Sequence, residues 1–161
     1  MSEAEKRRGW WPSLVIWEAV TLGLGALNGL LTSGSMDVYE SIQKPPLSPT
    51  GWVFPVAWGI LYAAMALSAW LVWRENAPGS RGWLALWAAQ LAVNLAWPWL
   101  FFVLRAFGLA FVWLAVLWAL AGLLMIGFFR QQKVAGWLLV PYLLWLTFAG
   151  YLSFMVARLN P

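Results

Sequence analysis

The side chains in this sequence that could do chemistry are amides and indoles, because two residue types on which most enzymes rely are missing. The 161 residues include no cysteine and no histidine. Their absence excludes disulfides, thiol nucleophiles, a histidine general base and the usual protein ligands of zinc and haem iron. Any function must therefore rest on aromatic rings, amides, hydroxyls, the backbone or a bound ligand.

One pair of amides lies in the middle of an apolar stretch. Gln90 and Asn94 are four residues apart, so both lie on one face of a helix. Pro98 follows and has no N–H, so the carbonyl of Asn94 loses its helical partner. Polar groups in hydrocarbon are costly unless they are paired. Two interpretations stay open: the amides join helices, which is the more common use, or they anchor a ligand in an apolar pocket.

Tryptophan is unusually abundant, with 15 residues in 161. Those near the ends of apolar stretches are explained by an aromatic belt at the membrane surface. Trp58 and Trp145 lie deeper. Trp145 shares a helix face with Tyr142 and with Ala149, whose small side chain leaves room beside the indole. The deep indoles are candidate walls of a pocket for a flat apolar ligand.

The elements that must position these groups are membrane helices. The composition is 63% hydrophobic and 10% charged, against about 25% charged in soluble domains. A helix needs about 20 apolar residues to cross the hydrocarbon, and five stretches reach this length. We predict one domain over residues 1–161, an all-α integral membrane protein built as a five-transmembrane-helix bundle. The predicted helices lie near 12–32, 51–74, 81–104, 107–129 and 134–157.

Lysine and arginine set the predicted orientation. Seven of them fall on the side of the N-terminus: Lys6, Arg7, Arg8, Arg74, Arg81, Arg130 and Lys133. Three fall on the other side: Lys44, Arg105 and Arg158. This bias predicts a bacterial cell membrane protein with a cytoplasmic N-terminus, although the rule would not apply in an outer membrane, which stays open. Because the basic residues form no single face, a nucleic-acid partner is not expected.

The connection 33–50 is the one long link between the predicted helices. Its three prolines, Pro45, Pro46 and Pro49, are expected to hold the stretch that begins at Lys44 extended outside the bilayer, where a missing N–H does no harm. Pro55 then falls in the first turn of the next helix, whose N–H groups have no partner in any case. This helix start aims Trp58 inward. We therefore predict that 33–50 is a stiff lid over a pocket.

Small residues mark two close-packing faces. Gly25 and Gly29 permit the close approach of another helix or of a flat ligand. Ala88, Ala92 and Ala96 form a ridge on the third helix, which we predict as a homodimer interface.

Three blocks of the sequence carry a resemblance to a known family. They are "VYESIQKPPLSPTGWVFPVAWGILY", "QLAVNLAWPWLFF" and "PYLLWLTFAGYLSFMVARLN". The chain resembles the translocator protein family, also called tryptophan-rich sensory proteins or peripheral-type benzodiazepine receptors, from the first helix to Asn160. It departs from the family pattern at Val38 and Leu47, where tryptophan is usual, and at Thr50, where proline is usual.

The resemblance implies a five-helix membrane receptor, transport or sensory protein. Such a protein binds porphyrins such as protoporphyrin IX, and other apolar aromatic ligands, in an intramembrane pocket, and often forms dimers. No metal and no cofactor besides the porphyrin ligand are implied. The matching ligand-binding positions are Tyr39, Pro49, Trp58, Asn94, Trp145 and Ala149. Some bacterial members are reported to degrade porphyrin in light, and the resemblance then implies Trp58 and Trp145 as catalytic residues.

Several functions are open at this point. A binding protein and a light- and oxygen-dependent degrading enzyme would use the same pocket, with Lys44 attracting a propionate at its mouth. A secondary transporter is disfavoured by five helices without an internal repeat. One acid within the spans, Glu18, argues against an ion pump. Sterol binding is not expected, because Tyr151 lies seven residues from Arg158, outside the sterol-recognition spacing. A structural scaffold would leave the deep tryptophans unexplained.

Overall fold

The computed structural model describes residues 10–32 and 34–161, and five long helices dominate this part of the chain. They are α2 (Trp10–Leu31), α4 (Val53–Glu75), α5 (Ser80–Pro98), α6 (Phe107–Gln131) and α7 (Lys133–Leu159). A short helix, α3 (Ser35–Ser41), and a π-helix, η1 (Trp99–Val103), complete the elements. With η1 continuing α5, five helices are long and apolar enough to cross a membrane. The prediction of an all-α five-helix membrane protein is confirmed.

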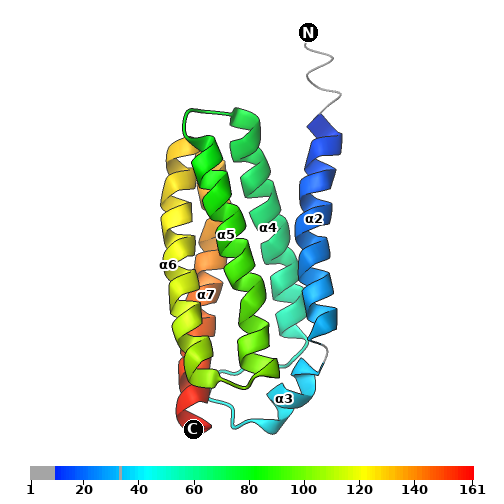
Figure 1. The fold of residues 1–161 in the computed structure, drawn as a ribbon, viewed down its shortest axis with the longest axis vertical. Coiled ribbons are helices and arrows are strands. Elements are labelled where there is room, and N and C mark those ends of the chain that lie inside the picture. Colours follow the sequence, from blue (N-terminus) through cyan, green and yellow to red (C-terminus); the bar gives the residue numbers. More distant parts are fainter. Residues whose placement is uncertain (1–9, 33) are drawn as a thin grey trace.

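The long helices form one antiparallel bundle. α2 packs against α4, α4 against α7, α7 against α6, and α6 against α5. The start of α2 and the links α4–α5 and α6–α7 lie at one end of the bundle, while α3 and the end of α7 lie at the other (Figure 1). The described cations divide between these ends as expected, whereas Lys6, Arg7 and Arg8 lie outside the described residues. The orientation in the membrane therefore stays a prediction.

The core lies between α4, α6 and α7, and α2 contributes least to it. Met65, Leu124 and Tyr142 are fully buried at the centre. On α2 the outward side chains are open, and Leu30 is 72% exposed. Exposed leucine and valine over a whole helix face are stable where that face meets lipid rather than water.

Pro98 changes the third span. The sequence predicts a continuous helix over 81–104, but α5 ends at Pro98 and the chain continues as a π-helix. The N–H of Leu104 bonds to the carbonyl of Trp99, five residues back, at 2.9 Å. Because proline supplies no N–H, the hydrogen-bond ladder is interrupted, and the bond after it spans five residues instead of four, which widens the turn. In the wider turn, the side chains after Pro98 point in directions that differ from those in a continuous α-helix.

A polar clamp from α2 holds this irregular turn. The amide of Asn28 donates to the carbonyl of Leu95 at 3.0 Å. Its oxygen accepts from the indole N–H of Trp99 at 2.8 Å. One side chain thus satisfies a backbone carbonyl and an indole in a region where lipid offers neither a donor nor an acceptor.

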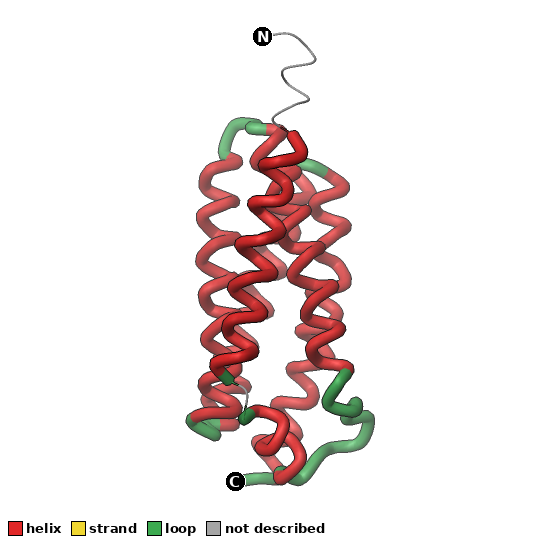
Figure 2. The backbone as a smooth tube through the Cα atoms, turned by 90° about the vertical axis from the view of Figure 1, so that its right-hand side faces the viewer, coloured by secondary structure: helices red, strands yellow, loops and turns green. Residues whose placement is uncertain are grey.

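The lid, described from residue 34, is helical in its first part and irregular after Ser41. Its first part forms α3, because the seven residues of that helix contain no proline and Asp37 lies in the first turn, where an acid is favourable. The extended part begins at Ile42, just before the prolines. Figure 2 shows this segment folded beneath the end of the bundle. Pro55 is the third residue of α4, in its first turn as predicted.

Candidate ligand-binding site

An aromatic wall runs from the lid into the bundle. The Tyr39 hydroxyl donates to the carbonyl of Pro49 at 2.6 Å, and the Tyr39 side chain is 6% exposed. Its ring meets Phe54 edge-on, with centroids 5.2 Å apart, and Phe54 meets Trp145 in the same way at 6.1 Å. The structure therefore brings together three predicted residues, Tyr39, Pro49 and Trp145, through a residue that was not predicted.

Phe54 is the member of the wall that sequence reasoning missed. Phe54 is the second residue of α4, one turn before Trp58, so the two rings lie on the same helix face. This spacing of four residues, across a proline in the first turn of the helix, was the available signal in the sequence. The helix start thus supplies two rings to the wall rather than one.

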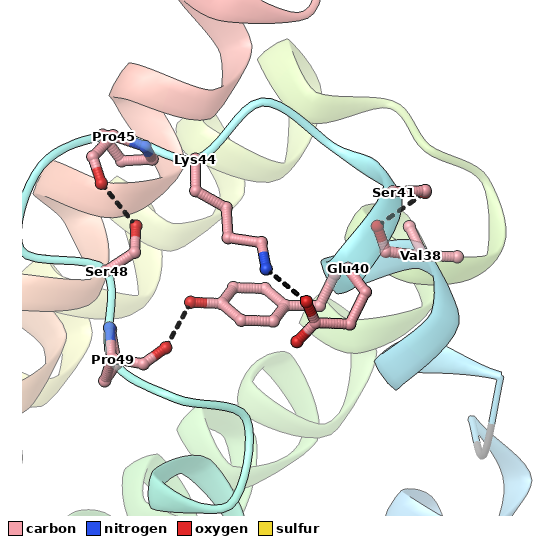
Figure 3. A network of polar contacts seen from close by, with 8 residues as sticks. Val38, Glu40, Ser41, Lys44, Pro45, Ser48 and Pro49 are labelled. Atoms are coloured by element: carbon pink, nitrogen blue, oxygen red, sulfur yellow. Dashed lines mark hydrogen bonds and ion pairs between the residues drawn. The ribbon is translucent and has the colours of Figure 1, made fainter.

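The lid carries one ion pair beside this wall. The ammonium of Lys44 lies 2.6 Å from a carboxylate oxygen of Glu40 and 4.7 Å from the centre of the Tyr39 ring (Figure 3). A phenol is protonated at neutral pH at its ordinary pKa, and burial raises the pKa of Tyr39 further, in keeping with the bond its hydroxyl donates to Pro49. The partly exposed ion pair contributes little stability, so Lys44 can exchange Glu40 for another carboxylate.

Trp58 and Asn94, two further predicted residues, lie deeper in the bundle. Trp58 lies with its ring 5.5 Å from that of Tyr62 and 6.3 Å from that of Tyr142. The Tyr62 hydroxyl donates to the amide oxygen of Asn94 at 2.7 Å, and the amide nitrogen of Asn94 donates to the Tyr142 oxygen at 3.1 Å. Both ends of the Asn94 amide therefore bond to other helices. This geometry supports the helix-joining interpretation of Asn94.

Gln90 ends the same chain of hydrogen bonds. The Tyr142 hydroxyl donates to Oε1 of Gln90 at 2.9 Å, which links α7 back to α5. Gln90 is fully buried, and its Nε2 has no hydrogen-bond partner among the described residues. In each of these three hydrogen bonds the donor lies on the Tyr62 side and the acceptor on the Gln90 side. This series of hydrogen bonds therefore ends in a buried N–H donor, Nε2 of Gln90, which can donate to a carbonyl or carboxylate oxygen.

Trp145 faces two environments. Besides Phe54, it borders an apolar groove of about 440 Å³ between α4 and α7. The other residues lining this groove are Ala57, Ile60, Leu61, Pro141, Leu144 and Phe148. The indole N–H of Trp145 is buried and has no hydrogen-bond partner among the described residues. Ala149, one turn further along α7, is half-buried against the main core. Trp145 therefore forms the border between the aromatic wall and the lipid-facing groove.

The structure distinguishes Gly25 from Gly29, the two glycines of the predicted close-packing face of α2. A Cβ atom on Gly25 would lie 2.5 Å from the Tyr62 ring, whereas one on Gly29 would have no neighbour within 4 Å. Gly25 thus serves the packing of α2 on α4. Ala88 and Ala92 are exposed on α5 and Ala96 is half-buried, so part of the predicted dimer ridge is open.

Comparison with known proteins now adds to this geometry. The model of the TspO/MBR family matches residues 17–159. The chain belongs to the TspO/MBR family. It is 39% identical to Protein CrtK of Rhodobacter capsulatus over 140 residues, covering 85% of this chain and 86% of that protein. This confirms the resemblance seen in the three sequence blocks.

Relatives in the family come from animals as well as bacteria. The chain is 38% identical to the Translocator protein of Bos taurus over 155 residues, with 94% of this chain and 91% of that one covered. It is 37% identical to the Tryptophan-rich sensory protein of Cereibacter sphaeroides over 148 residues, with 89% and 92% covered. The match extends over the lid and all five spans, so the chain is an integral membrane protein of the TspO/MBR family.

Proposed function

We propose that this TspO/MBR protein is a membrane receptor, sensory or transport protein that binds porphyrins, such as protoporphyrin IX, and other flat apolar ligands. The observation that carries the proposal is the aromatic wall. Tyr39, Phe54 and Trp145 meet edge to face, and Trp58 continues the wall one turn further along α4. Pockets for such ligands combine apolar and aromatic walls with a few placed polar groups.

The chemistry of a porphyrin fits these groups. Its ring offers a large face to indoles and phenyl rings, and each aromatic contact contributes about 0.5–1.5 kcal/mol beyond the burial of area. Its carboxylates carry negative charge, which Lys44 at the lid can attract. The buried donor of Gln90 suits an oxygen or a pyrrole-edge acceptor deeper in the bundle. Pro49 and Ala149 would border the ligand from the lid and from α7. Asn94 would act through Tyr62 and Tyr142, to which it is bonded.

A tryptophan-quenching titration with protoporphyrin IX tests the proposal. The double variant Trp58→Phe, Trp145→Phe is expected to bind about tenfold more weakly, because two indole contacts are replaced by smaller rings. The double variant Trp118→Phe, Trp137→Phe is the matched control, since both of its indoles are exposed, at 45% and 65%, away from the wall. It loses the same number of fluorophores and is expected to keep the affinity of the unaltered protein. Equal affinities in the two double variants would contradict the proposed site.

Light-dependent degradation would use the same two indoles and stays a prediction. Illuminated, oxygenated protein would then consume the bound porphyrin and form a product with a new absorption spectrum. A porphyrin spectrum that persists under illumination would assign the protein to binding without turnover.

We also propose that the open alanine ridge of α5 forms a homodimer in the membrane. Small residues let two helices approach closely, and a leucine on the ridge would hold them apart. Ala92→Leu is therefore expected to weaken dimerisation in detergent at least tenfold, as measured by light scattering. Ala119→Leu, at an exposed position on α6, is the control and is expected to leave dimerisation unchanged. A dimer that survives Ala92→Leu unchanged would place the interface elsewhere.

A further inference from the structure

The last turn of α7 is fastened to the lid by one amide side chain. The oxygen of Asn160 accepts from the backbone N–H of Gln43 at 2.9 Å. Its nitrogen donates to the backbone carbonyl of Gln43 at 3.1 Å and to that of Val156 at 3.0 Å. A single side chain therefore binds both backbone groups of one lid residue while it is itself oriented by its own helix.

A second fastening lies beside the first. The hydroxyl of Tyr151, also on α7, donates to the carbonyl of Pro46 at 3.1 Å. Pro46 is three residues after Gln43, so the two contacts hold one short stretch of the lid at two points. We call Asn160 and Tyr151, together with these bonds, the latch.

The lid itself is braced from within. The Tyr39 hydroxyl bonds to Pro49, and the Ser48 hydroxyl donates to the carbonyl of Pro45 at 2.8 Å (Figure 3). The bond from Tyr39 to Pro49 joins the helical part of the lid to its extended part, and the bond from Ser48 to Pro45 lies within the extended part. Neither bond reaches α7. The lid is therefore a unit that can move as one piece when its outer attachments are released.

The latch is more accessible to water than the apolar contact that also holds the lid against α7. The bonds of the latch between the lid and α7 are solvent-exposed, whereas Ile42 on the same segment packs against the apolar cluster that contains Val156. Leu47, directly after Pro46, has φ 70 and is 79% exposed. This left-handed conformation is strained for leucine. Water competes for exposed hydrogen bonds, which favours release of the latch before release of the buried apolar contact.

We propose that Asn160 and Tyr151 are positioning residues that latch the lid and set how fast a ligand enters and leaves the aromatic wall. This inference rests on the proposed function. A latch that holds the lid closed slows both the entry of a ligand to the aromatic wall and its exit. Loosening it raises the association and dissociation rates together and leaves the equilibrium affinity nearly unchanged, which a residue contacting the ligand would not do.

Two measurements on the full chain test the latch. Amide hydrogen exchange follows the lid without any ligand, and stopped-flow tryptophan quenching with protoporphyrin IX follows passage. In Asn160→Ala and in Tyr151→Phe, exchange of the peptide covering residues 40–48 is expected to be about tenfold faster, which is the effect of losing about one ordinary hydrogen bond. Both porphyrin rate constants are expected to rise by a similar factor. Tyr151→Phe removes a single hydroxyl and so leaves the end of α7 intact.

Gln131→Ala is the matched control. It removes another exposed bond from an amide side chain to a backbone carbonyl, that of Pro78 at 3.2 Å, at the opposite end of the bundle. It is expected to leave lid exchange and porphyrin rates unchanged.

The outcomes separate the two proposals. Unchanged lid exchange in both latch variants would overturn the latch, whatever the protein binds. Faster amide exchange of the lid with unchanged porphyrin association and dissociation rates would overturn the role of the latch in controlling ligand entry and exit. An unaltered protein that does not quench with protoporphyrin IX would overturn the proposed function and the gating role built on it, while exchange would still decide whether the latch holds the lid.

Discussion

Asn94→Leu is expected to lower the free energy of unfolding by about 2 kcal/mol, although leucine is the more apolar residue. Asn94 is 3% exposed and bonds through its oxygen to Tyr62 and through its nitrogen to Tyr142. Leucine leaves the Tyr62 hydroxyl buried without an acceptor, and an orphaned buried donor costs about 1–3 kcal/mol. Membrane hydrogen bonds between helices themselves contribute less, about 0.6 kcal/mol on average. The orphaned partner, rather than the lost bond, sets the size of the effect.

A double-mutant cycle with Tyr62→Phe separates these contributions. The double variant Tyr62→Phe, Asn94→Leu has no orphaned Tyr62 hydroxyl, so it is expected to be more stable than the sum of the two single changes by about 1 kcal/mol. Reversible unfolding in mixed detergent micelles measures all four proteins under the same conditions. Additive effects would mean that the two side chains do not depend on each other, contrary to the 2.7 Å bond between them.

Gly25→Ala is expected to destabilise the bundle by about 2 kcal/mol, within the range seen when a methyl group is forced into a packed core. The added Cβ would lie 2.5 Å from the Tyr62 ring. That ring cannot simply turn aside, because its hydroxyl is bonded to Asn94 and its face lies against Trp58. The strain would therefore reach the same hydrogen-bonded chain that the first prediction addresses.

Gly29→Ala is the control for this change. A methyl group there meets nothing within 4 Å, and alanine is favoured over glycine within helices by up to about 1 kcal/mol. The control is expected to be neutral or slightly stabilising in the same unfolding assay. Equal effects at the two positions would mean that α2 does not pack on Tyr62 as described.

The long helices could be predicted because their signal is continuous. Stretches such as 82–104 and 134–157 carry no charge, and a bilayer leaves an uncharged segment of that length few alternatives to a helix. Local interruptions were harder to predict. Pro98 was recognised as removing a hydrogen bond, but whether the helix kinks, ends or widens depends on what satisfies the freed carbonyls. Here Asn28, on another helix, donates to the carbonyl of Leu95, the residue after Asn94.

Several residues predicted to bind a ligand lie near one another in the structure, but the contacts between them could not be predicted from the sequence. Phe54 joins Tyr39 to Trp145, and its place between them depends on how the lid docks. That these residues bind a ligand stays a prediction. Asn28 could have been found by the argument applied to Asn94, since both are amides within an apolar span. The pairing of Gln43 with Asn160 had no local signal at all, because the two residues are 117 positions apart.

That separation has a consequence for how the protein is made. Gln43 emerges during synthesis long before Asn160, so the lid cannot be fastened until α7 has been inserted and docked. Contacts between distant parts of a chain form late, because a large loop must close first. Newly made chains therefore pass through a stage in which the lid and Phe54 have been made but Trp145 on α7 has not yet docked against them. The aromatic wall and the fastening of the lid are then completed together, in the last step of assembly.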